Sequence, residues 1–189
     1  YGDHRDLHLS IRRQRQMCIR DRSTEYLVNL ALLFRNSELS GEELASKIRD
    51  LLVLSKNDLL EISIMHECRY LSLDVTIESA RRFHAAVPDR RKRLIMSYLE
   101  KTGIETEKFE KLFRSINPEG LILKPMVDGE RLANVTGLIP GPRLGRLKGW
   151  LHRRQIEEAS RTEEDVLQFL SEIDWKSSDY QEWKALSWP

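Results

Sequence analysis

Apolar residues recur at intervals of three and four positions along almost the whole chain from Ser23 onward. This spacing places them on one face of an α-helix. The periodicity predicts helices near residues 24–34, 40–53, 56–71, 75–87, 89–102, 106–116, 129–136, 142–158 and 163–173, with a further one near 178–187. Three of these begin with a hydroxyl residue followed three positions later by an acidic one, as in helix N-caps: Ser40 with Glu43, Ser55 with Asp58, and Thr162 with Asp165.

Proline and glycine mark the ends of helices and a boundary between two helical parts. Pro88 separates two predicted helices, and Gly103 and Gly137 each follow one. The stretch GLILKPMV, residues 120–127, is expected to be an extended connector, because the residue before a proline avoids the α region. We therefore expect an all-α fold with an irregular helical body and a small helical tail domain. The expected segments are a leader at 1–22, the body at 23–116, the tail at 117–175 and an extension at 176–189.

The composition is typical of a water-soluble chain with room for one substantial core or two small ones. Its 189 residues are 40% hydrophobic. No apolar run approaches the roughly 18 to 20 residues that a membrane span needs, and no apolar signal-peptide region is present. The two cysteines, Cys18 and Cys68, lack the spacing of a zinc site or a disulfide framework. We therefore expect a soluble, cytoplasmic protein that does not contact a membrane.

The net charge of +1 conceals a division of charge along the chain. Residues 1–22 carry six arginines against three aspartates, and residues 117–154 carry seven basic against three acidic side chains. Residues 23–116 contain equal numbers of basic and acidic side chains, and residues 155–189 have an excess of six negative charges. Two segments could therefore attract a polyanion such as RNA, and the C-terminal one could not.

The histidines and carboxylates predict no catalytic or metal site. His66, His84 and His152 each lack a second ligand at helical spacing, so we interpret them as core or surface residues. Acidic pairs such as Glu42 and Glu43 fall in first turns of predicted helices, where the helix dipole favours negative charge. The chain also contains no Gly-rich phosphate loop, nucleophile elbow or HExxH motif. No catalytic residue and no metal ligand is therefore predicted.

The stretch TGLIPGPRLGRLKGWLHRRQIEE, residues 136–158, is the best candidate for a binding surface. Gly141 and Pro142 suit the start of a helix, because proline presets φ and has no N–H to leave unbonded. At about 100° per residue, a basic stripe with one aromatic falls within one arc: Arg143, Arg146, Trp150, Arg153 and Arg154. The adjacent apolar face consists of Leu144, Leu147 and Leu151. Gly145 and Gly149 lie on a third side, where another backbone could approach closely.

This stripe predicts contacts with an RNA backbone. Arginine forks onto phosphates, and an indole stacks on a base or a sugar. The expected RNA-binding residues are Arg143, Arg146, Lys148, Trp150, Arg153 and Arg154. The alternative is that Trp150 belongs to the core and the arginines pair with the acidic residues that begin at Glu157. The sequence leaves both interpretations open.

Residues 116–158, INPEGLILKPMVDGERLANVTGLIPGPRLGRLKGWLHRRQIEE, resemble the C-terminal part of the class II tRNA nucleotidyltransferases (CCA-adding enzymes) and bacterial-type poly(A) polymerases. The matching positions are Lys124-Pro125, Asp128-Gly129, Gly137-Leu138, Gly141-Pro142 and Gly145. Upstream, LASKIRDLLVLSKNDLLEI, residues 44–62, is similar to the family's Leu-Arg-x-Leu-x-Leu-Ser-Asn segment and the helix after it. The resemblance covers roughly residues 26–175 and is strongest over the last third.

The resemblance implies a body and tail that hold tRNA for a catalytic head, which adds C, C and A to the 3′ end using Mg²⁺, CTP and ATP. The head's Gly-Ser segment and Asp-x-Asp metal pair and the neck's nucleotide-selecting Asp and Arg are not recognisable here. Phe34-Arg35 stands where related enzymes carry a His-Asp motif. We therefore expect the chain to bind tRNA, to hold no cofactor of its own and to be inactive alone.

The missing selecting residues leave CCA addition and poly(A) synthesis indistinguishable. Two other classes also remain open: a stand-alone helical RNA-binding or adaptor protein, and a degenerate His-Asp phosphohydrolase body.

The first 22 residues carry a separate signal. Met-Cys-Ile-Arg-Asp, residues 17–21, matches in full one reading frame of a transposon-end adapter common in sequencing libraries. A gene model that runs off a broken contig would produce this match and would also account for an absent catalytic head. We therefore expect residues 1–22 to be a non-native leader and the chain to be a C-terminal fragment.

Overall fold

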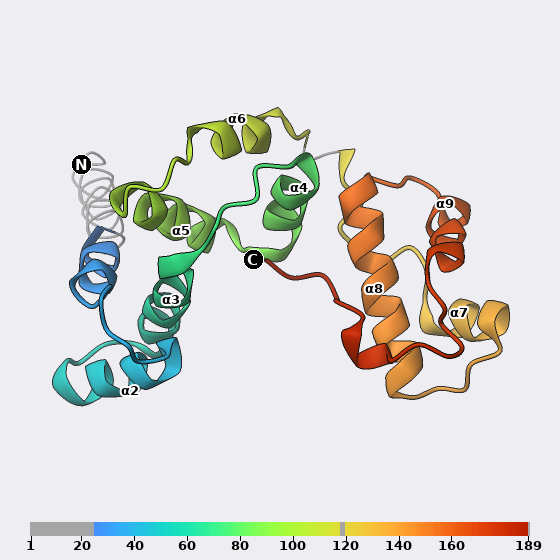
Figure 1. Cartoon of the computed structure of the whole chain (residues 1–189), viewed down its shortest axis with the longest axis horizontal. Coiled ribbons are helices and arrows are strands. Elements are labelled where there is room, and N and C mark those ends of the chain that lie inside the picture. The colour runs from blue at the N-terminus through green and yellow to red at the C-terminus, as the bar shows by residue number, and fades with distance from the viewer. Residues whose placement is uncertain (1–24, 118–119, 189) are drawn as a thin grey trace, which may run out of the picture. The chain divides into compact units, whose positions relative to one another are not determined.

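The computed structural model of the protein describes residues 25–117 and 120–188. These residues form helices joined by loops and contain no strand, which confirms the all-α prediction (Figure 1). Residues 25–33 are helical. The further α-helices are α2 (Gly41–Leu51), α3 (Lys56–Glu67), α4 (Ile77–Ala86), α5 (Asp89–Lys101), α6 (Glu107–Ser115), α7 (Gly129–Thr136), α8 (Pro142–Glu158) and α9 (Glu163–Gln168). Short 3-10 helices are η1 (Cys68–Tyr70), η3 (Phe169–Glu172) and η4 (Tyr180–Glu182). The expected leader at 1–22 lies outside the described residues.

The predicted helix caps are formed. The Ser40 hydroxyl accepts from the N–H of Glu43 at 3.3 Å, and the Glu43 carboxylate accepts from the N–H of Ser40 at 2.9 Å. The hydroxyls of Ser55 and Thr162 cap α3 and α9 by accepting from the N–H groups of Asp58 and Asp165, without the return bond to the cap residue's own N–H that Glu43 makes. Gly137 ends α7 at φ 71°, a left-handed conformation that glycine adopts without steric cost.

Two predicted helices near the C-terminal end differ from the prediction. The helix expected at 163–173 is α-helical only to Gln168 and continues as η3. The helix expected at 178–187 is reduced to the single turn η4, and residues 183–188 after it are neither helix nor strand. Trp183 and Trp188 lie five positions apart in this segment, and each packs against other parts of the chain. Tertiary contacts of these two side chains therefore override the weak helical pattern.

Packing divides the chain into two compact units. The first unit consists of the residues up to Ser72 together with Arg90–Glu105, and the second consists of Leu73–Asp89 together with Thr106–Pro189. Helices α4 and α6 thus pack in the same unit as α7, α8 and α9. The boundary predicted between body and tail at 116 and 117 rests on chain composition and stays a prediction.

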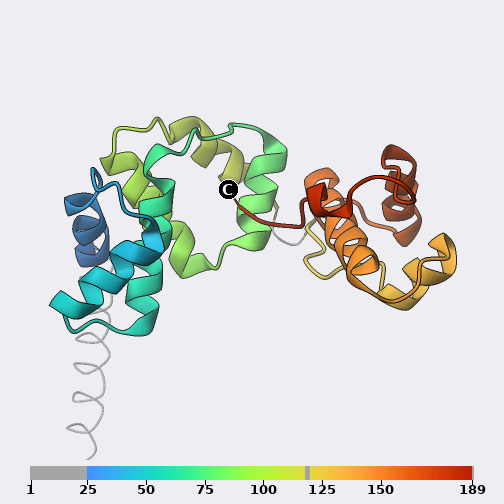
Figure 2. The ribbon, with the colours of Figure 1, turned by 60° about the horizontal axis from the view of Figure 1, so that its bottom comes forward.

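In the first unit, α2 packs against α3, and the two helices lie side by side in both views (Figure 2). Gly41 is buried at this contact, and its N–H donates to the Glu67 carboxylate at the end of α3. Cys68 is buried and forms no disulfide with a described residue. Burial raises the pKa of its thiol to about 11, so the thiol stays protonated at neutral pH.

His66 is a core residue of the first unit, as one of the two sequence interpretations expected. The ring is fully buried, and its Nε2 lies 2.9 Å from the carbonyl oxygen of Leu39. Because only a protonated nitrogen can donate to a carbonyl, Nε2 carries the hydrogen. Nδ1 is buried without a hydrogen-bond partner among the described residues. A second proton would therefore place an uncompensated charge in the core, and burial accordingly lowers the pKa of His66 below 6.5.

This burial predicts a loss of stability in mild acid. Below pH 6.5 the unfolded chain binds a proton at His66 and the folded chain does not, so the free energy of unfolding falls as the pH drops toward the lowered folded pKa. We expect urea unfolding to show a smaller decrease in stability between pH 7 and pH 5 for His66→Gln than for the wild type. An equal decrease in stability for the wild type and His66→Gln would contradict the conclusion that His66 is buried in its neutral form.

The second unit is organised around α8, which contacts α4, α7 and α9 (Figure 1). One buried hydrophobic cluster of this unit consists of Val127, Leu132, Leu144, Leu147, Leu151, Val166 and Trp183. On α4, the Phe83 ring meets the rings of Phe109, Phe113 and Trp188. Among the described residues, no helix combines the length and the apolar character that crossing a membrane requires.

Candidate functional site

Helix α8 begins and faces its core as the sequence predicts. Gly141 is the N-cap residue and Pro142 occupies the first helical position. Leu144, Leu147 and Leu151 are all buried in the core of the second unit. The remaining faces of α8 carry the six residues predicted to bind RNA. Trp150 is partly buried and packs against the core of the second unit, and the five cations lie in three different environments.

Arg143 holds the C-terminal segment of the chain. Its guanidinium donates to the backbone carbonyl oxygens of Trp175 at 2.8 Å, Lys176 at 2.9 Å and Ser178 at 2.9 Å. The charge also lies 5.4 Å and 5.5 Å from the ring centres of Tyr180 and Trp183. These contacts occupy both terminal nitrogens of Arg143, so its clearest role is structural.

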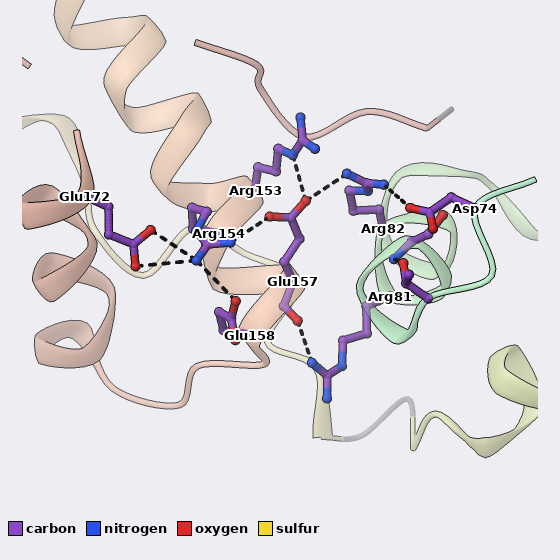
Figure 3. Close-up of polar contacts among 10 residues, drawn as sticks. Asp74, Arg81, Arg82, Arg153, Arg154, Glu157, Glu158 and Glu172 are labelled. Atoms are coloured by element: carbon purple, nitrogen blue, oxygen red, sulfur yellow. Dashed lines mark hydrogen bonds and ion pairs between the residues drawn. The ribbon is translucent and has the colours of Figure 1, made fainter. Parts of the chain in front are cut away.

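Arg153 and Arg154 pair with acidic residues, which is the alternative that the sequence left open (Figure 3). Both contact Glu157, a carboxylate that is only 6% exposed: Arg153 at 2.8 Å and Arg154 at 3.3 Å. Arg154 also bridges to Glu158 at 3.2 Å and to Glu172 at 3.1 Å. The acidic C-terminal region thus neutralises this end of α8.

Two arginines of α4, which the sequence reasoning missed, complete this cluster. Arg82 donates to the Glu157 carboxylate at 2.8 Å, and Arg81 donates to the backbone carbonyl of Glu157 (Figure 3). They lie 75 and 76 positions from Glu157, so no local pattern could have paired them. Burial alone would raise the pKa of the Glu157 carboxyl, but hydrogen bonds and charges from Arg153, Arg82 and Arg154 hold the pKa below its usual value. Glu157 is therefore an ionised, buried hub of the second unit.

Arg146 and Lys148 are the two predicted cations whose whole charged group is without a partner among the described residues. Arg146 is exposed and Lys148 is half-buried, and neither forms a hydrogen bond or an ion pair with any described residue. Beside them, Gly145 is open, since an added Cβ would meet no atom within 4 Å. Gly149 is different, because a Cβ there would lie 3.0 Å from the Cβ of Ala185. The close approach predicted at Gly149 is therefore made by the chain's own C-terminal segment.

Gln155 and His152 fix the connector that precedes α7. The buried Gln155 amide donates to the carbonyls of Ile122 at 2.7 Å and Lys124 at 2.9 Å, and it accepts from the N–H of Met126 at 3.0 Å. His152 Nε2 lies 3.0 Å from the carbonyl of Leu123, and burial lowers the pKa of this ring. Residues 121–127 of the connector are neither helix nor strand, and side chains of α8 bond to part of its backbone in place of a partner strand.

Within the described residues, no group of three or more His, Cys, Asp or Glu side chains could hold a metal ion. Comparison with known proteins finds no family model, no characterised protein and no solved structure that matches this chain. The geometry of α8 and its neighbours is therefore the basis on which a function can be argued.

Proposed function

We propose that the chain is the tRNA-holding part of a class II tRNA nucleotidyltransferase or of a related poly(A) polymerase. The proposal combines the sequence resemblance over residues 116–158 with one structural observation. That observation is the solvent-accessible start of α8, where Arg146 and Lys148 form no hydrogen bond or ion pair with a described residue. A surface of this kind suits a phosphate group.

The first turn of α8 offers more than the two side chains. Gly141, Pro142, Gly145 and Arg146 are exposed, so the turn is accessible to a large partner. The first backbone N–H groups of a helix have no intrahelical acceptor, and the helix dipole adds partial positive charge there. Phosphate oxygens accept from such groups. We therefore propose that this turn, Arg146 and Lys148 contact the RNA backbone.

Backbone contacts of this kind fix the register of the RNA and carry no base sequence. In the proposed protein, nucleotide transfer belongs to a catalytic head, for which the resemblance implies Mg²⁺, CTP and ATP. The described residues of this chain then contribute by orienting the acceptor end. CCA addition and poly(A) synthesis require the same positioning, so both remain candidates.

The proposal predicts a specific change in the salt dependence of tRNA binding. Each phosphate contact contributes roughly 0.7–0.9 to the slope of log K against log salt concentration. We expect Arg146→Ala to lower this slope by that amount, and Arg146→Ala combined with Lys148→Ala to lower it by about twice as much. Filter binding of tRNA between 50 and 200 mM salt, the range over which such slopes are resolved, measures the effect.

Arg143→Ala is the matched control, because it removes the same charge from the same helix at a residue bound to backbone carbonyls. It should leave the salt slope unchanged and lower the urea midpoint of unfolding. If the slope of the Arg146→Ala, Lys148→Ala double variant equals that of the wild type, these residues do not bind RNA.

A second candidate is a helical adaptor that binds another protein. The first unit exposes large apolar side chains at the end of α2 and on α3, among them Leu51, Val53 and Leu60. Exposed apolar side chains close together are typical of interaction surfaces. Absence of tRNA binding at low salt, where backbone contacts are strongest, would favour this candidate.

A further inference from the structure

A hollow of about 440 Å³ lies beside α8 within the second unit. Its walls come from the last turns of α8, from η3 and from the segment around η4. The lining residues are Trp150, Arg153, Arg154, Glu157, Glu172, Glu182 and Lys184. The volume falls within the range of roughly 300 to 1,000 Å³ that is typical of small-molecule sites.

Some of the charged groups in the walls are already satisfied by one another. Arg154 contacts Glu157 at 3.3 Å and Glu172 at 3.1 Å, so these three form an internal network. They shape the wall and leave little capacity for a ligand.

Three other charged groups in the hollow are available. Arg153 uses only its Nε, which donates to Glu157, and in Figure 3 its terminal nitrogens point away from that carboxylate. Glu182 and Lys184 form no side-chain hydrogen bond or ion pair with any described residue. The hollow therefore offers two cationic donors, Arg153 and Lys184, and one anionic acceptor, Glu182.

Trp150 supplies a flat apolar surface beside these groups. It packs against the core of the second unit and is partly exposed, and it also lines the hollow. An indole that is supported from behind by a core is held in a fixed orientation and is well suited to stack on a planar ring.

These groups together specify the chemistry of a ligand. Arg153 and Lys184 require an anionic group, Glu182 requires hydroxyl or amino donors, and Trp150 favours a planar ring. Because the carboxylates of Glu172 and Glu182 lie in the same walls, we expect the hollow to accept a single phosphate group and not several. We propose that the hollow binds one phosphorylated nucleoside unit, with its base stacked on Trp150 and its phosphate between Arg153 and Lys184. Glu182 accepts from the ribose hydroxyls or a base amine.

Two kinds of molecule can supply this phosphorylated nucleoside: a free mononucleotide, or an RNA strand of which one nucleotide enters the hollow. The site is separate from the contacts proposed for Arg146 and Lys148, so it stands even if tRNA binding fails. AMP and CMP, with inorganic phosphate and adenosine as partial ligands, are the probes for isothermal titration of the full chain. We expect saturable binding of a mononucleotide at least tenfold tighter than binding of either partial ligand.

Lys184→Ala is the decisive variant, because Lys184 is exposed and its loss breaks no hydrogen bond or ion pair with a described residue. It should weaken mononucleotide binding about tenfold, the usual effect of losing one charge-assisted hydrogen bond. The matched control is Lys176→Ala, an exposed lysine that packs over the Trp175 ring and does not line the hollow. It should bind as the wild type does.

Competition with RNA identifies the source of the bound nucleotide, and the titrations with the lysine variants test the site itself. A short single-stranded oligoribonucleotide that competes with AMP identifies RNA as the source, and failure to compete identifies the free nucleotide. The proposal is overturned if neither mononucleotide nor oligonucleotide binds saturably, if phosphate alone binds as tightly, or if the two lysine variants weaken binding equally.

Discussion

Replacing Glu157 with glutamine is expected to lower the free energy of unfolding of the second unit by about 2 kcal/mol. The change keeps the side-chain size and removes the charge that Arg82, Arg153 and Arg154 share. Removing one partner of a buried ion pair typically costs about 3–5 kcal/mol. The cost is smaller here, because Arg82 keeps Asp74 and Arg154 keeps Glu172. Arg153 alone loses the one ion pair that it forms with a described residue. Urea unfolding followed by circular dichroism measures the difference.

The neighbouring Glu158→Gln variant is the matched control. The side chain of Glu158 is 44% exposed, and its one ion pair among the described residues is with Arg154 at 3.2 Å, so its neutralisation should change the stability by less than about 0.5 kcal/mol. If the two glutamine variants unfold at the same urea concentration, the buried Glu157 carboxylate contributes no more to stability than the exposed Glu158 carboxylate does.

The pH dependence of the free energy of unfolding is a second, independent test of the ion pairs of Glu157. The folded-state pKa of Glu157 lies below its ordinary value of 4.5, so its contribution is complete above pH 4.5 and is lost as the pH falls through the lower folded value. The stability difference between wild type and Glu157→Gln should therefore stay constant from pH 8 to about pH 5 and narrow in stronger acid. A difference that narrows already near neutral pH would mean that another group titrates.

The helices were predictable from sequence because their signals are local. Ser40 and Glu43 lie three positions apart and form the capping contact by themselves, and Gly137 ends α7 through its own φ angle. Pro142 likewise starts α8 without help from the rest of the chain. Interactions within one helical turn depend little on the fold, so periodicity and caps identify most elements.

The roles of the arginines were not predictable in the same way. A helical projection places Arg143, Arg146 and Arg153 on one side of α8, but it does not show which of them has a partner elsewhere. Arg143 binds carbonyls 32 to 35 positions away, and Arg153 meets a carboxylate that Arg82 of α4 also holds. Long-range contacts therefore distinguish Arg143 and Arg153, which are held directly or through a shared carboxylate by other parts of the chain, from Arg146, which has no partner among the described residues.

Replacing Gly41 with alanine is expected to destabilise the first unit by about 2–3 kcal/mol. Gly41 is buried where α2 begins against α3. A Cβ at this position would lie 2.7 Å from the Ser63 hydroxyl and 2.9 Å from the Glu67 carboxylate, and it would also collide with the Ser63 backbone carbonyl. A backbone atom cannot rotate away as a side chain can, so α2 must shift. The shift would also disturb the hydrogen bond from the Gly41 N–H to Glu67.

Gly129→Ala tests whether the loss of stability expected for Gly41→Ala comes from the packing around the residue or from the replacement of a glycine as such. Gly129 occupies the same first helical position in α7, after the N-cap Asp128, and an added Cβ there would meet no atom within 4 Å. Alanine at an open position of this kind should be neutral or stabilising by up to about 1 kcal/mol, because it restricts the unfolded chain. Urea midpoints of the two variants should therefore move apart. A midpoint for Gly41→Ala equal to or above that of the wild type would show that α2 and α3 are not in close contact at Gly41.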